Sequence, residues 1–330
     1  MIEEGVRVQD SGFRGGADRI VVAAGVIRDA DDRLLLAQRP AGKHLAGLWE
    51  FPGGKCEPGE SPHQALAREL EEEVGIQIAA SRPLLSLTHA YPEKTVRLLI
   101  REVRHWQGQP HGREGQPLQW TSLDQAGLLP MPEADRPMLK MLAVDPRLVI
   151  TPDPDELSSA DDFLAYWQHC LDAGFRFLQL RAPSLSSNRL ADLAERCGDL
   201  VRARGARWLL DGPADLAVLC GADGVHLDAG SLDQTRRRPL PENMLVGVSC
   251  HDADTLAKAG EIGADFVCLS PIDSTASSPE YGPWEWNDFA SLCAQSPLPV
   301  MAAGGIRADD LDRSREAGGF GVAGMLESKS

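Results

Sequence analysis

Three glutamates close together in the chain are the residues best suited to do chemistry. Glu69, Glu72 and Glu73 stand at positions i, i+3 and i+4 of the segment ARELEEEVGI, so in a helix all three would project from one side. Clustered carboxylates repel one another unless a cation lies among them. Hard oxygen ligands favour Mg²⁺ or Mn²⁺. The spacing therefore predicts a divalent-metal site, although a solvated acidic helix face is the alternative interpretation.

The residues around these glutamates predict the helix that carries them. Ser61, followed by Pro62 and Gln64, is typical of a helix start, with a hydroxyl cap, a proline in the first turn and a capping-box glutamine. Gly75 is typical of a helix end. The apolar residues of the adjacent arc, which we expect to pack against a sheet, are Leu66, Ala67, Leu70 and Val74.

Composition limits the classes of partner. The net charge of −16 and the sequence pI near 4.9 argue against a nucleic-acid polymer, because phosphate backbones require a basic surface. The seven cysteines include no C-x-x-C pair, so we expect reduced thiols in a cytoplasmic protein. The polar, acidic start of the chain does not have the form of a signal peptide, and no apolar run is long enough to span a membrane.

A length of 330 residues predicts two domains. We expect a flexible tail over 1–17, a first domain over 18–144, a linker over 145–147 and a second domain over 148–330. In the first domain, apolar runs at 20–28 and 33–38 around Asp29-Ala30-Asp31-Asp32 predict two strands and a turn. Further expected elements are a strand entering the glycine loop at 49–54, a strand at 96–103 and a helix at 137–143.

The second domain repeats short apolar runs between helix-like stretches. Eight such runs predict a (β/α)₈ barrel. Only six residues follow the eighth run, too few for a normal last helix. We therefore expect one side of the barrel to be covered by the first domain or by a second subunit in a homodimer. The eight predicted strands are Leu148–Thr151, Phe177–Arg181, Arg207–Asp211, Gly224–Asp228, Leu245–Ser249, Phe266–Pro271, Pro299–Gly305 and Phe320–Gly324.

The stretch from Gly54 to Ile76 fills every fixed position of the Nudix box, and residues 20–142 as a whole resemble the MutT branch of that family. Further matching segments are VVAAGVIRDADDRLLLAQRP, HLAGLWEFPGGK, GREGQPLQWTSL and MPEADRP. The resemblance implies a Nudix α/β/α sandwich that acts on a small-molecule nucleotide. It also implies Mg²⁺-dependent hydrolysis of 8-oxo-dGTP to 8-oxo-dGMP and pyrophosphate, which avoids mutation during DNA replication.

The same resemblance implies roles for individual residues. Glu69 is expected nearest the attacking water, with Lys55 facing the phosphates and Glu114 completing the catalytic group. Arg68 is expected to anchor the helix by pairing with Glu60. The implied metal ligands are the Gly54 carbonyl and the carboxylates of Glu69, Glu72, Glu73 and Glu114.

Recognition of the base departs from the resembling family at one position. An asparagine that reads the oxidised purine is expected near the closing helix, where this chain has Asp135. An ionised aspartate only accepts hydrogen bonds, so it would repel a carbonyl oxygen of the base. Arg39 and Tyr91 are further candidates for contacting sugar or base, and surface or packing roles are their plainer interpretation.

Residues 147–324 resemble the thiamine-phosphate synthase superfamily, including its TenI-like members. The matching segments are LVITPD, FLQLR, GADGVHLD, VGVSCHD, GADFVCLSP and PVMAAGGI. The resemblance implies that a thiamine-pathway phosphate binds in the barrel. His251 would move a proton, as in TenI-like thiazole tautomerases, or would be an ordinary loop histidine. The residues expected to contact this ligand are Gln179, Arg181, Ser249, His251, Gly304, Gly305 and Gly324.

Several positions depart from the synthase pattern, and synthase activity is therefore not expected. The expected cations and metal ligands are replaced at Pro183, at Leu210 (beside Asp211), at Ser231 and near Ser278. Two alternatives to a nucleotide hydrolase with an altered barrel remain open. The first half could hydrolyse another pyrophosphate, such as a thiamine-related one, or the barrel could be a non-catalytic phosphate sensor or scaffold.

Overall fold

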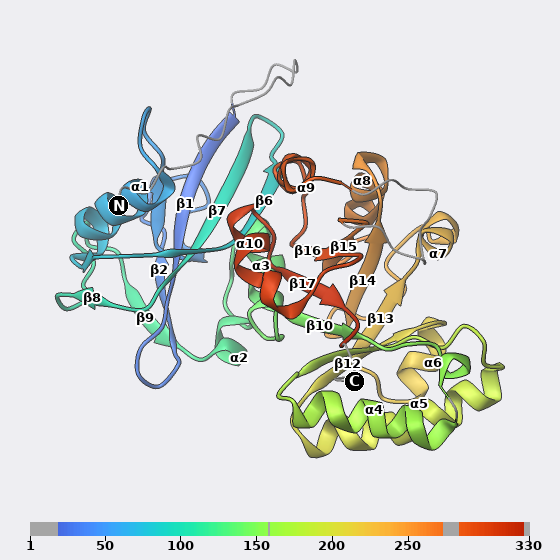
Figure 1. Cartoon of the computed structure of the whole chain (residues 1–330). Helices are drawn as coiled ribbons and strands as arrows, with labels where there is room; N and C mark the ends of the chain where they lie inside the picture. The colour runs from blue at the N-terminus through green and yellow to red at the C-terminus, as the bar shows by residue number, and fades with distance from the viewer. Residues whose placement is uncertain (1–18, 158, 273–283, 327–330) are drawn as a thin grey trace, which may run out of the picture.

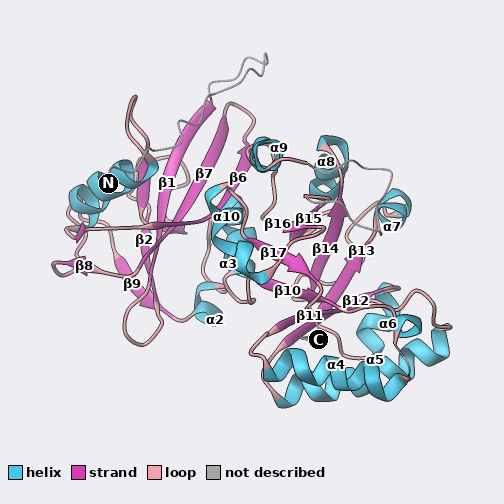
Figure 2. Ribbon diagram, viewed as in Figure 1, coloured by secondary structure: helices cyan, strands magenta, loops and turns pink. Residues whose placement is uncertain are grey.

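The computed structural model describes residues 19–157, 159–272 and 284–326, which form two α/β halves (Figure 1). Figure 2 shows that sheets dominate the first half, whereas helices surround a closed barrel in the second. The predicted tail over 1–17 lies outside the described residues. Among the described helices, none combines the length and apolar character needed to cross a membrane. All seven cysteines are free thiols.

The larger sheet of the first half has four strands in the order β4-β1-β7-β6. The central strand β1 (Arg19–Ile27) pairs in parallel with β7 (Thr95–Val103) and antiparallel with β4 (Gly53–Lys55). Strand β6 (Arg82–Ala90) pairs only with β7 and lies at the edge. The remaining elements of this half are β2 (Leu34–Gln38), β3 (Trp49–Glu50), β5 (Gln77–Ile78), β8 (Trp106–Gln107), β9 (Leu118–Thr121), α1 (Pro62–Glu69), α2 (Leu123–Ala126) and α3 (Arg136–Met141).

The predicted strand–turn–strand is confirmed by β1 and β2. The Asp29 carboxylate closes the turn by accepting the backbone N–H groups of Asp31 at 3.0 Å and Arg33 at 2.9 Å. Strands at 49–50, 53–55 and 95–103 and helix α3 also match the prediction. Strand β6 was not predicted, although it is as long as β1 and makes the contacts between the two halves.

The helix that carries Glu69, Glu72 and Glu73 starts as predicted, and its last turn has π-helical instead of α-helical geometry. Ser61 and Gln64 form a reciprocal capping box, and Gly75 ends the helix with φ of 73°. Between them, α1 passes into one π-helical turn over Leu70–Val74. Leu66, Leu70 and Val74 are fully buried under the sheets, so the predicted apolar arc is confirmed.

Residues 147–324 close into an eight-stranded parallel barrel, which confirms the predicted fold. Each strand is hydrogen-bonded to the next, and the last pairs with the first. The strands are β10 (Arg147–Ile150), β11 (Phe177–Leu180), β12 (Arg207–Asp211), β13 (Gly224–Leu227), β14 (Leu245–Cys250), β15 (Phe266–Leu269), β16 (Val300–Ala303) and β17 (Gly321–Gly324). The helices around them are α4 (Ala160–Asp172), α5 (Ser187–Ala203), α6 (Ala214–Leu219), α7 (Ala229–Gln234), α8 (Ala253–Glu261), α9 (Trp286–Cys293) and α10 (Leu311–Glu316).

The barrel has no helix after β17 within the described residues, as the short remaining chain predicts. Instead, Leu326 runs beside α4, where its N–H donates to the Tyr166 hydroxyl at 2.9 Å. That hydroxyl donates in turn to the Leu326 carbonyl at 3.2 Å. Of the two expected covers for this side, the first half lies elsewhere, because it contacts the barrel at the amino-terminal ends of the strands, and a second subunit stays a prediction.

The edge strand β6 forms the hydrogen bonds of this contact. Ser86 N–H donates to the carbonyl of Gly318 at 2.9 Å, and Thr88 N–H donates to the carbonyl of Ser296 at 2.8 Å. The Thr88 hydroxyl adds a bond to the Ala294 carbonyl at 2.9 Å. Gly318 and the 294–296 turn precede β17 and β16, so they lie on the floor of the barrel. The contact satisfies backbone donors that a sheet edge would otherwise leave unpaired.

One apolar core continues from the first half into the barrel floor. Met138 and Met141 of α3 are fully buried in the same cluster as Phe177, Phe266 and Met301 from barrel strands. The inward-facing residues at the lower end of the barrel therefore pack against α3 and β6. Because neither half closes this core alone, we expect the two halves to unfold together.

This shared core predicts a single cooperative unfolding transition. Met138→Ala in the first half and Met301→Ala in the barrel should each lower the free energy of unfolding by about 2–5 kcal/mol, the range for deleting a buried methionine side chain. Scanning calorimetry of the full chain should show one transition that either substitution moves to lower temperature. Two separate transitions, each moved by only one substitution, would contradict a shared core.

Candidate functional site

The three helix glutamates leave the backbone at the junction of α1 and the π-helical turn. Glu69 is the last residue of α1, and Glu72 and Glu73 lie in the turn. Their side chains are 15%, 61% and 24% exposed, respectively. The predicted common face is therefore uneven. Glu69 and Glu73 face the interior of the site, whereas Glu72 extends towards solvent.

Arg68 connects this helix to the loop before it. Its guanidinium bonds both carboxylate oxygens of Glu60 at 2.8 and 3.0 Å and donates to the Lys55 carbonyl at 3.0 Å. These bonds hold the pKa of Glu60 down to about 2. The anchoring role predicted for Arg68 agrees with this geometry. Arg68 also lies 2.9 Å from Glu69 and 3.3 Å from Glu72, so it is part of the carboxylate cluster as well.

The loop at 111–116 places the fourth carboxylate, Glu114, beside the helix end. The last carbonyls of the helix accept bonds from this loop: His111 N–H donates to Val74, while Arg113 N–H and the Gln116 amide donate to Glu73, each at 2.9 Å. A helix end needs partners for its free carbonyls, and this loop supplies them. The loop bonds also accompany the change from α to π geometry in the last turn.

Glu73 lies where the negative charges are most crowded. Burial, together with the charges of Glu69 and Glu114, raises its pKa to about 7 against the opposing effect of Lys43. The Lys43 ammonium lies 2.7 Å from Glu114 and 3.7 Å from Glu73. A cation therefore already lies between two of the predicted metal ligands. The sequence analysis missed Lys43, whose only signal is its place just before the matching segment HLAGLWEFPGGK.

The oxygen donors fit a hard divalent cation such as Mg²⁺ or Mn²⁺. A Cβ atom on Gly54 would lie 2.2 Å from the carboxyl carbon of Glu69, so only glycine allows this carboxylate to lie against the β4 backbone. The predicted ligands Gly54 and Glu69 are thus in direct proximity. No three His, Cys, Asp or Glu side chains in the described ranges are close enough to hold a metal as they stand. Binding would require Lys43 and Glu72 to turn away from their present partners.

The predicted base-contacting residues form a second cluster next to the carboxylates. Arg39 forms an ion pair with Glu50, and both interact electrostatically with Tyr91 and Asp135. Tyr91 packs edge-on against His44, with ring centroids 5.8 Å apart. Glu50 also contributes to the charge felt by Glu73, so the two clusters adjoin. Glu50 was not predicted, because nothing in the motif singles it out.

Burial favours the neutral form of Asp135 at pH 7, in contrast to the ionised acceptor expected from the sequence. Its side chain is buried at the start of α3. Burial and, to a smaller extent, the charge of Glu50 raise the pKa of Asp135 to about 8 against the opposing effect of Arg39. A neutral carboxyl group has one O–H donor and one carbonyl acceptor, as does the side-chain amide of asparagine. The difference from the expected asparagine is therefore smaller than the sequence indicated.

The predicted residues of the barrel all lie near the carboxyl-terminal ends of its strands. Gln179, Arg181 and Ser249 are at the ends of β11 and β14, with His251 just beyond. Gly304 and Gly305 follow β16 with φ of 77° and 72°. A Cβ on Gly304 would lie 2.9 Å from the Pro271 backbone, and one on Gly324 would lie 2.4 Å from the Ile306 carbonyl. These two glycines are therefore required by close packing, whatever they bind.

Polar side chains line the barrel interior at this end. The Gln179 amide donates to Asp211 at 3.3 Å, and burial raises the pKa of Asp211 to about 6. His226 Nε2 lies 2.9 Å from the Ser249 hydroxyl. Burial lowers the pKa of His226 to about 4, so this ring is neutral. Both the Gln179 carbonyl oxygen and His226 Nδ1 are buried and make no protein hydrogen bond.

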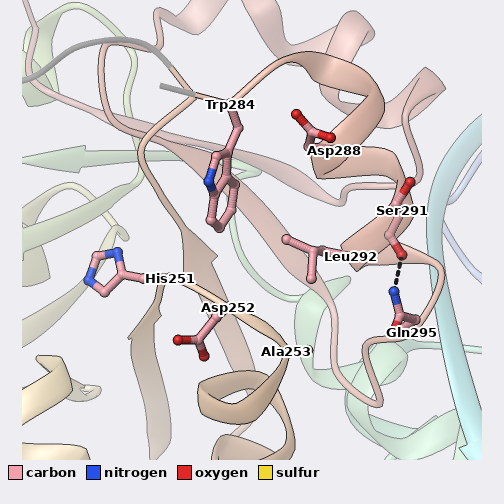
Figure 3. Close-up of a pocket in the computed structure, with 8 residues that line it drawn as sticks. All are labelled: His251, Asp252, Ala253, Trp284, Asp288, Ser291, Leu292 and Gln295. Carbon is pink, nitrogen blue, oxygen red and sulfur yellow. Dashed lines mark hydrogen bonds between the residues drawn. The ribbon is translucent and has the colours of Figure 1, made fainter. Parts of the chain in front are cut away.

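His251 lies at the edge of a pocket of about 440 Å³ beside the barrel (Figure 3). Its Nδ1 donates to the Ser270 carbonyl at 2.8 Å, which assigns the ring proton to Nδ1 when the ring is neutral. Asp252, Trp284 and Leu292 also line the pocket.

The departures from the synthase pattern occupy ordinary structural positions. Pro183 lies in the turn after β11, and Leu210 is fully buried in β12. Ser231 donates its N–H to the Asp228 carboxylate at 2.7 Å, which caps α7. Ser278 lies outside the described residues.

Comparisons with known proteins match each half of the chain to a protein family. Residues 23–141 match the model of the NUDIX domain, and residues 148–327, more than half of the chain, match that of thiamine monophosphate synthase. An 8-oxo-dGTP diphosphatase of Escherichia coli is 38% identical over 38% of this chain and 96% of its own length. A CTP pyrophosphohydrolase of the same organism is 41% identical over 37% of this chain and 89% of its own length.

For the barrel, a thiamine-phosphate synthase of Methanoregula boonei is 32% identical over 44% of this chain and 68% of its own length. The chain thus belongs to the thiamine monophosphate synthase family through its barrel, and a NUDIX domain is joined to that barrel on its amino-terminal side.

Proposed function

We propose that the NUDIX half is a metal-dependent nucleoside triphosphate pyrophosphohydrolase whose substrate is 8-oxo-dGTP. Its products would be 8-oxo-dGMP and pyrophosphate, and its role would be to remove an oxidised nucleotide before DNA replication. The observation that carries the proposal is the Glu69 carboxylate against Gly54, beside Glu73 and Glu114 and next to the cluster of Arg39, Tyr91 and Asp135. The 8-oxo-dGTP diphosphatase among the relatives supports the same substrate.

In this proposal Mg²⁺, or Mn²⁺ in its place, is held by Glu69, Glu72, Glu73, Glu114 and the Gly54 carbonyl. The metal would neutralise phosphate charge and lower the pKa of a bound water. Glu69 would take the proton from the attacking water as general base. The phosphates would then be bound by Lys43 and by Lys55, which is exposed at the end of β4.

The neutral Asp135 carboxyl suits an oxidised purine. 8-oxoguanine presents an N7–H donor next to the O6 acceptor, which match the carbonyl and the O–H of a neutral carboxyl. Unoxidised guanine presents two acceptors there, N7 and O6, so one carboxyl oxygen would face an acceptor without a proton between them. Such mismatches discriminate strongly in buried sites. Arg39 and Tyr91 would contact the sugar or the base.

A cytidine triphosphate is a second candidate, because the same neutral carboxyl also matches cytosine. Its O–H can donate to N3 and its carbonyl can accept from the N4 amino group. The CTP pyrophosphohydrolase among the relatives favours this candidate. A panel of 8-oxo-dGTP, dGTP, CTP, other nucleoside triphosphates and thiamine-pathway diphosphates, each with Mg²⁺, would decide the substrate through kcat/KM.

For the barrel we propose binding of a small phosphate ester without thiamine-phosphate synthesis. Pro183, Leu210 and Ser231 supply neither the charge nor the metal ligands that the synthase resemblance implies. His251 remains a candidate for proton transfer on a thiazole ring. A thiazole phosphate that raises the melting temperature without turnover would support a sensor role, since a ligand that binds only the folded state stabilises it. Turnover would support a tautomerase.

Removing the proposed base tests the site directly. Glu69→Gln keeps the size of the side chain but cannot accept a proton, so kcat should fall by roughly 10²–10⁴. The measurement is steady-state kinetics with the best nucleotide of the panel. Glu71→Gln is the matched control, because Glu71 is a neighbouring exposed glutamate whose carboxylate accepts a hydrogen bond from the Gln77 side chain and has no part in the proposed site. Near-full activity of Glu69→Gln would refute its role.

Metal dependence predicts a result that does not require turnover. Adding Mg²⁺ to chelator-treated protein should raise the melting temperature, because the cation relieves the repulsion among the carboxylates. In Gly54→Ala the added methyl group would displace the Glu69 carboxylate, so this increase should shrink or disappear. An equal increase in the wild type and in Gly54→Ala would argue against a metal held at this position.

The protonation of Asp135 predicts how substrate binding depends on pH. Its pKa is raised to about 8, so the O–H donor is present below pH 8 and is lost as the pH rises through that value. Relative to the KM of Asp135→Asn, the wild-type KM for 8-oxo-dGTP should be level below pH 8 and rise by about tenfold per unit above it, because the titration of Glu73 near 7 affects both proteins alike. Asp135→Asn should remove this dependence and keep the preference for the oxidised base. Because the nucleotide titrates in the same way with both proteins, the comparison with Asp135→Asn also removes that contribution to the pH profile. An identical pH profile in the variant would contradict the proposal.

A further inference from the structure

We propose that Lys140 is a positioning residue for binding of the nucleotide base. Its ion pair with the barrel floor fixes helix α3, and α3 in turn places Asp135 against the base. The inference rests on the proposed function of the NUDIX half. It makes the barrel a working part of the nucleotide site, in addition to any ligand that the barrel binds itself. The carrying observation is that α3 has Asp135 at one end and an ion pair with the barrel at the other.

The ion pair at the barrel end of α3 is tight and largely shielded. Lys140 Nζ lies 2.6 Å from Asp265 Oδ1, with the two side chains 29% and 5% exposed. The other carboxylate oxygen of Asp265 accepts from Arg238 at 2.7 Å and from the backbone N–H of Val246 at 2.8 Å. Glu242 lies 3.3 Å from Lys140 and completes a balanced group of two cations and two anions.

This group belongs to the floor of the barrel. Asp265 immediately precedes β15, Glu242 and Arg238 lie on the segment before β14, and Val246 is in β14. The Asp265 carboxylate is therefore held by two bonds from the barrel, and Lys140 is the contribution of the NUDIX half. Because Asp265 is buried and bound to the β14 backbone, it provides a rigid anchor for an otherwise mobile lysine side chain.

Helix α3 lies where the two halves meet (Figure 1). Its apolar side, with Met138 and Met141 fully buried, packs into the core that continues into the barrel, while Lys140 bonds the barrel from another side. A helix of six residues is only about 9 Å long. A rigid element this short transmits a shift of one end to the other.

The opposite end of α3 carries the group that would read the base. Asp135 is the residue before the first residue of α3, and its N–H donates to the Pro132 carbonyl at 3.0 Å. It is buried next to the Arg39–Glu50 pair and near Tyr91. A misplaced hydrogen-bonding group weakens recognition even when the reacting atoms are untouched. Loosening α3 at Lys140 should therefore affect binding of the base and leave the carboxylate cluster unchanged.

The test compares Lys140→Met with Lys140→Arg in the full chain, using kcat and KM for the best and the second-best nucleotide of the panel. Lys140→Met should raise the KM for the best nucleotide by roughly 3- to 30-fold, the range for residues that act through a packed element. It should also lower the ratio of kcat/KM for the best nucleotide to kcat/KM for the second-best. The kcat should stay within about twofold, since the reacting groups are not touched. Lys140→Arg retains the charge and should stay near the wild type.

The matched control is Lys258→Met. Lys258 is 30% exposed and pairs at 2.6 Å with Asp233, which is 75% exposed, so the lysine resembles Lys140 in its own exposure and in the pair distance, but both partners lie within the barrel. Its loss should leave KM unchanged. Asp265→Asn breaks the same pair from the barrel side and should reproduce the KM effect of Lys140→Met, with no further effect in the double variant.

Melting temperatures separate positioning from general stability. If Lys140→Met lowers the melting temperature but leaves KM and selectivity unchanged, the ion pair is only a structural contact. That result would overturn this inference and leave the proposed function standing. An equal rise in KM in Lys258→Met would overturn it in the same way. A wild-type chain that hydrolyses no nucleoside triphosphate of the panel would overturn the proposed function and this inference together.

Discussion

The repulsion between carboxylates in a half-buried space is the constraint on which the candidate site depends. Burial first, and then the charges of Glu69 and Glu114, raise the pKa of Glu73 to about 7. Such an arrangement persists only if cations lie among the acids. Arg68 and Lys43 supply two of them from the protein itself. A divalent ion is a more compact source of positive charge, and the glycine beside Glu69 leaves the carboxylate room to reach it.

The second constraint is the unsatisfied edge of the NUDIX sheet. Strand β6 exposes backbone donors that would otherwise pair with water or with another chain. The barrel floor accepts these donors through the carbonyls of Gly318 and Ser296, and its lower apolar layer is closed by α3. Each half therefore completes a surface that the other leaves open. This reciprocity is why we expect the two unrelated folds to unfold as one cooperative unit.

Features that depend on neighbouring residues in the chain were predictable. The capping box at Ser61, the stop at Gly75 and the eight barrel strands all follow from patterns within a few residues. Strand β6 was missed, because its mixed polar and apolar residues match the barrel floor, which lies more than 200 residues further along the chain. Lys43 was missed for the same reason, since its partner Glu114 comes from a distant segment.

The sequence by itself determined the kinds of group available: a set of acids at helical spacing, glycines where the backbone must come close, and alternating strands and helices. It could do so because these signals are local. Only the tertiary structure decided the charge on Asp135, the turn of Glu72 towards solvent and the docking of α3 on the barrel. A pKa depends on burial and on charges brought together from distant parts of the chain, and a helix finds its partners only when the chain has folded.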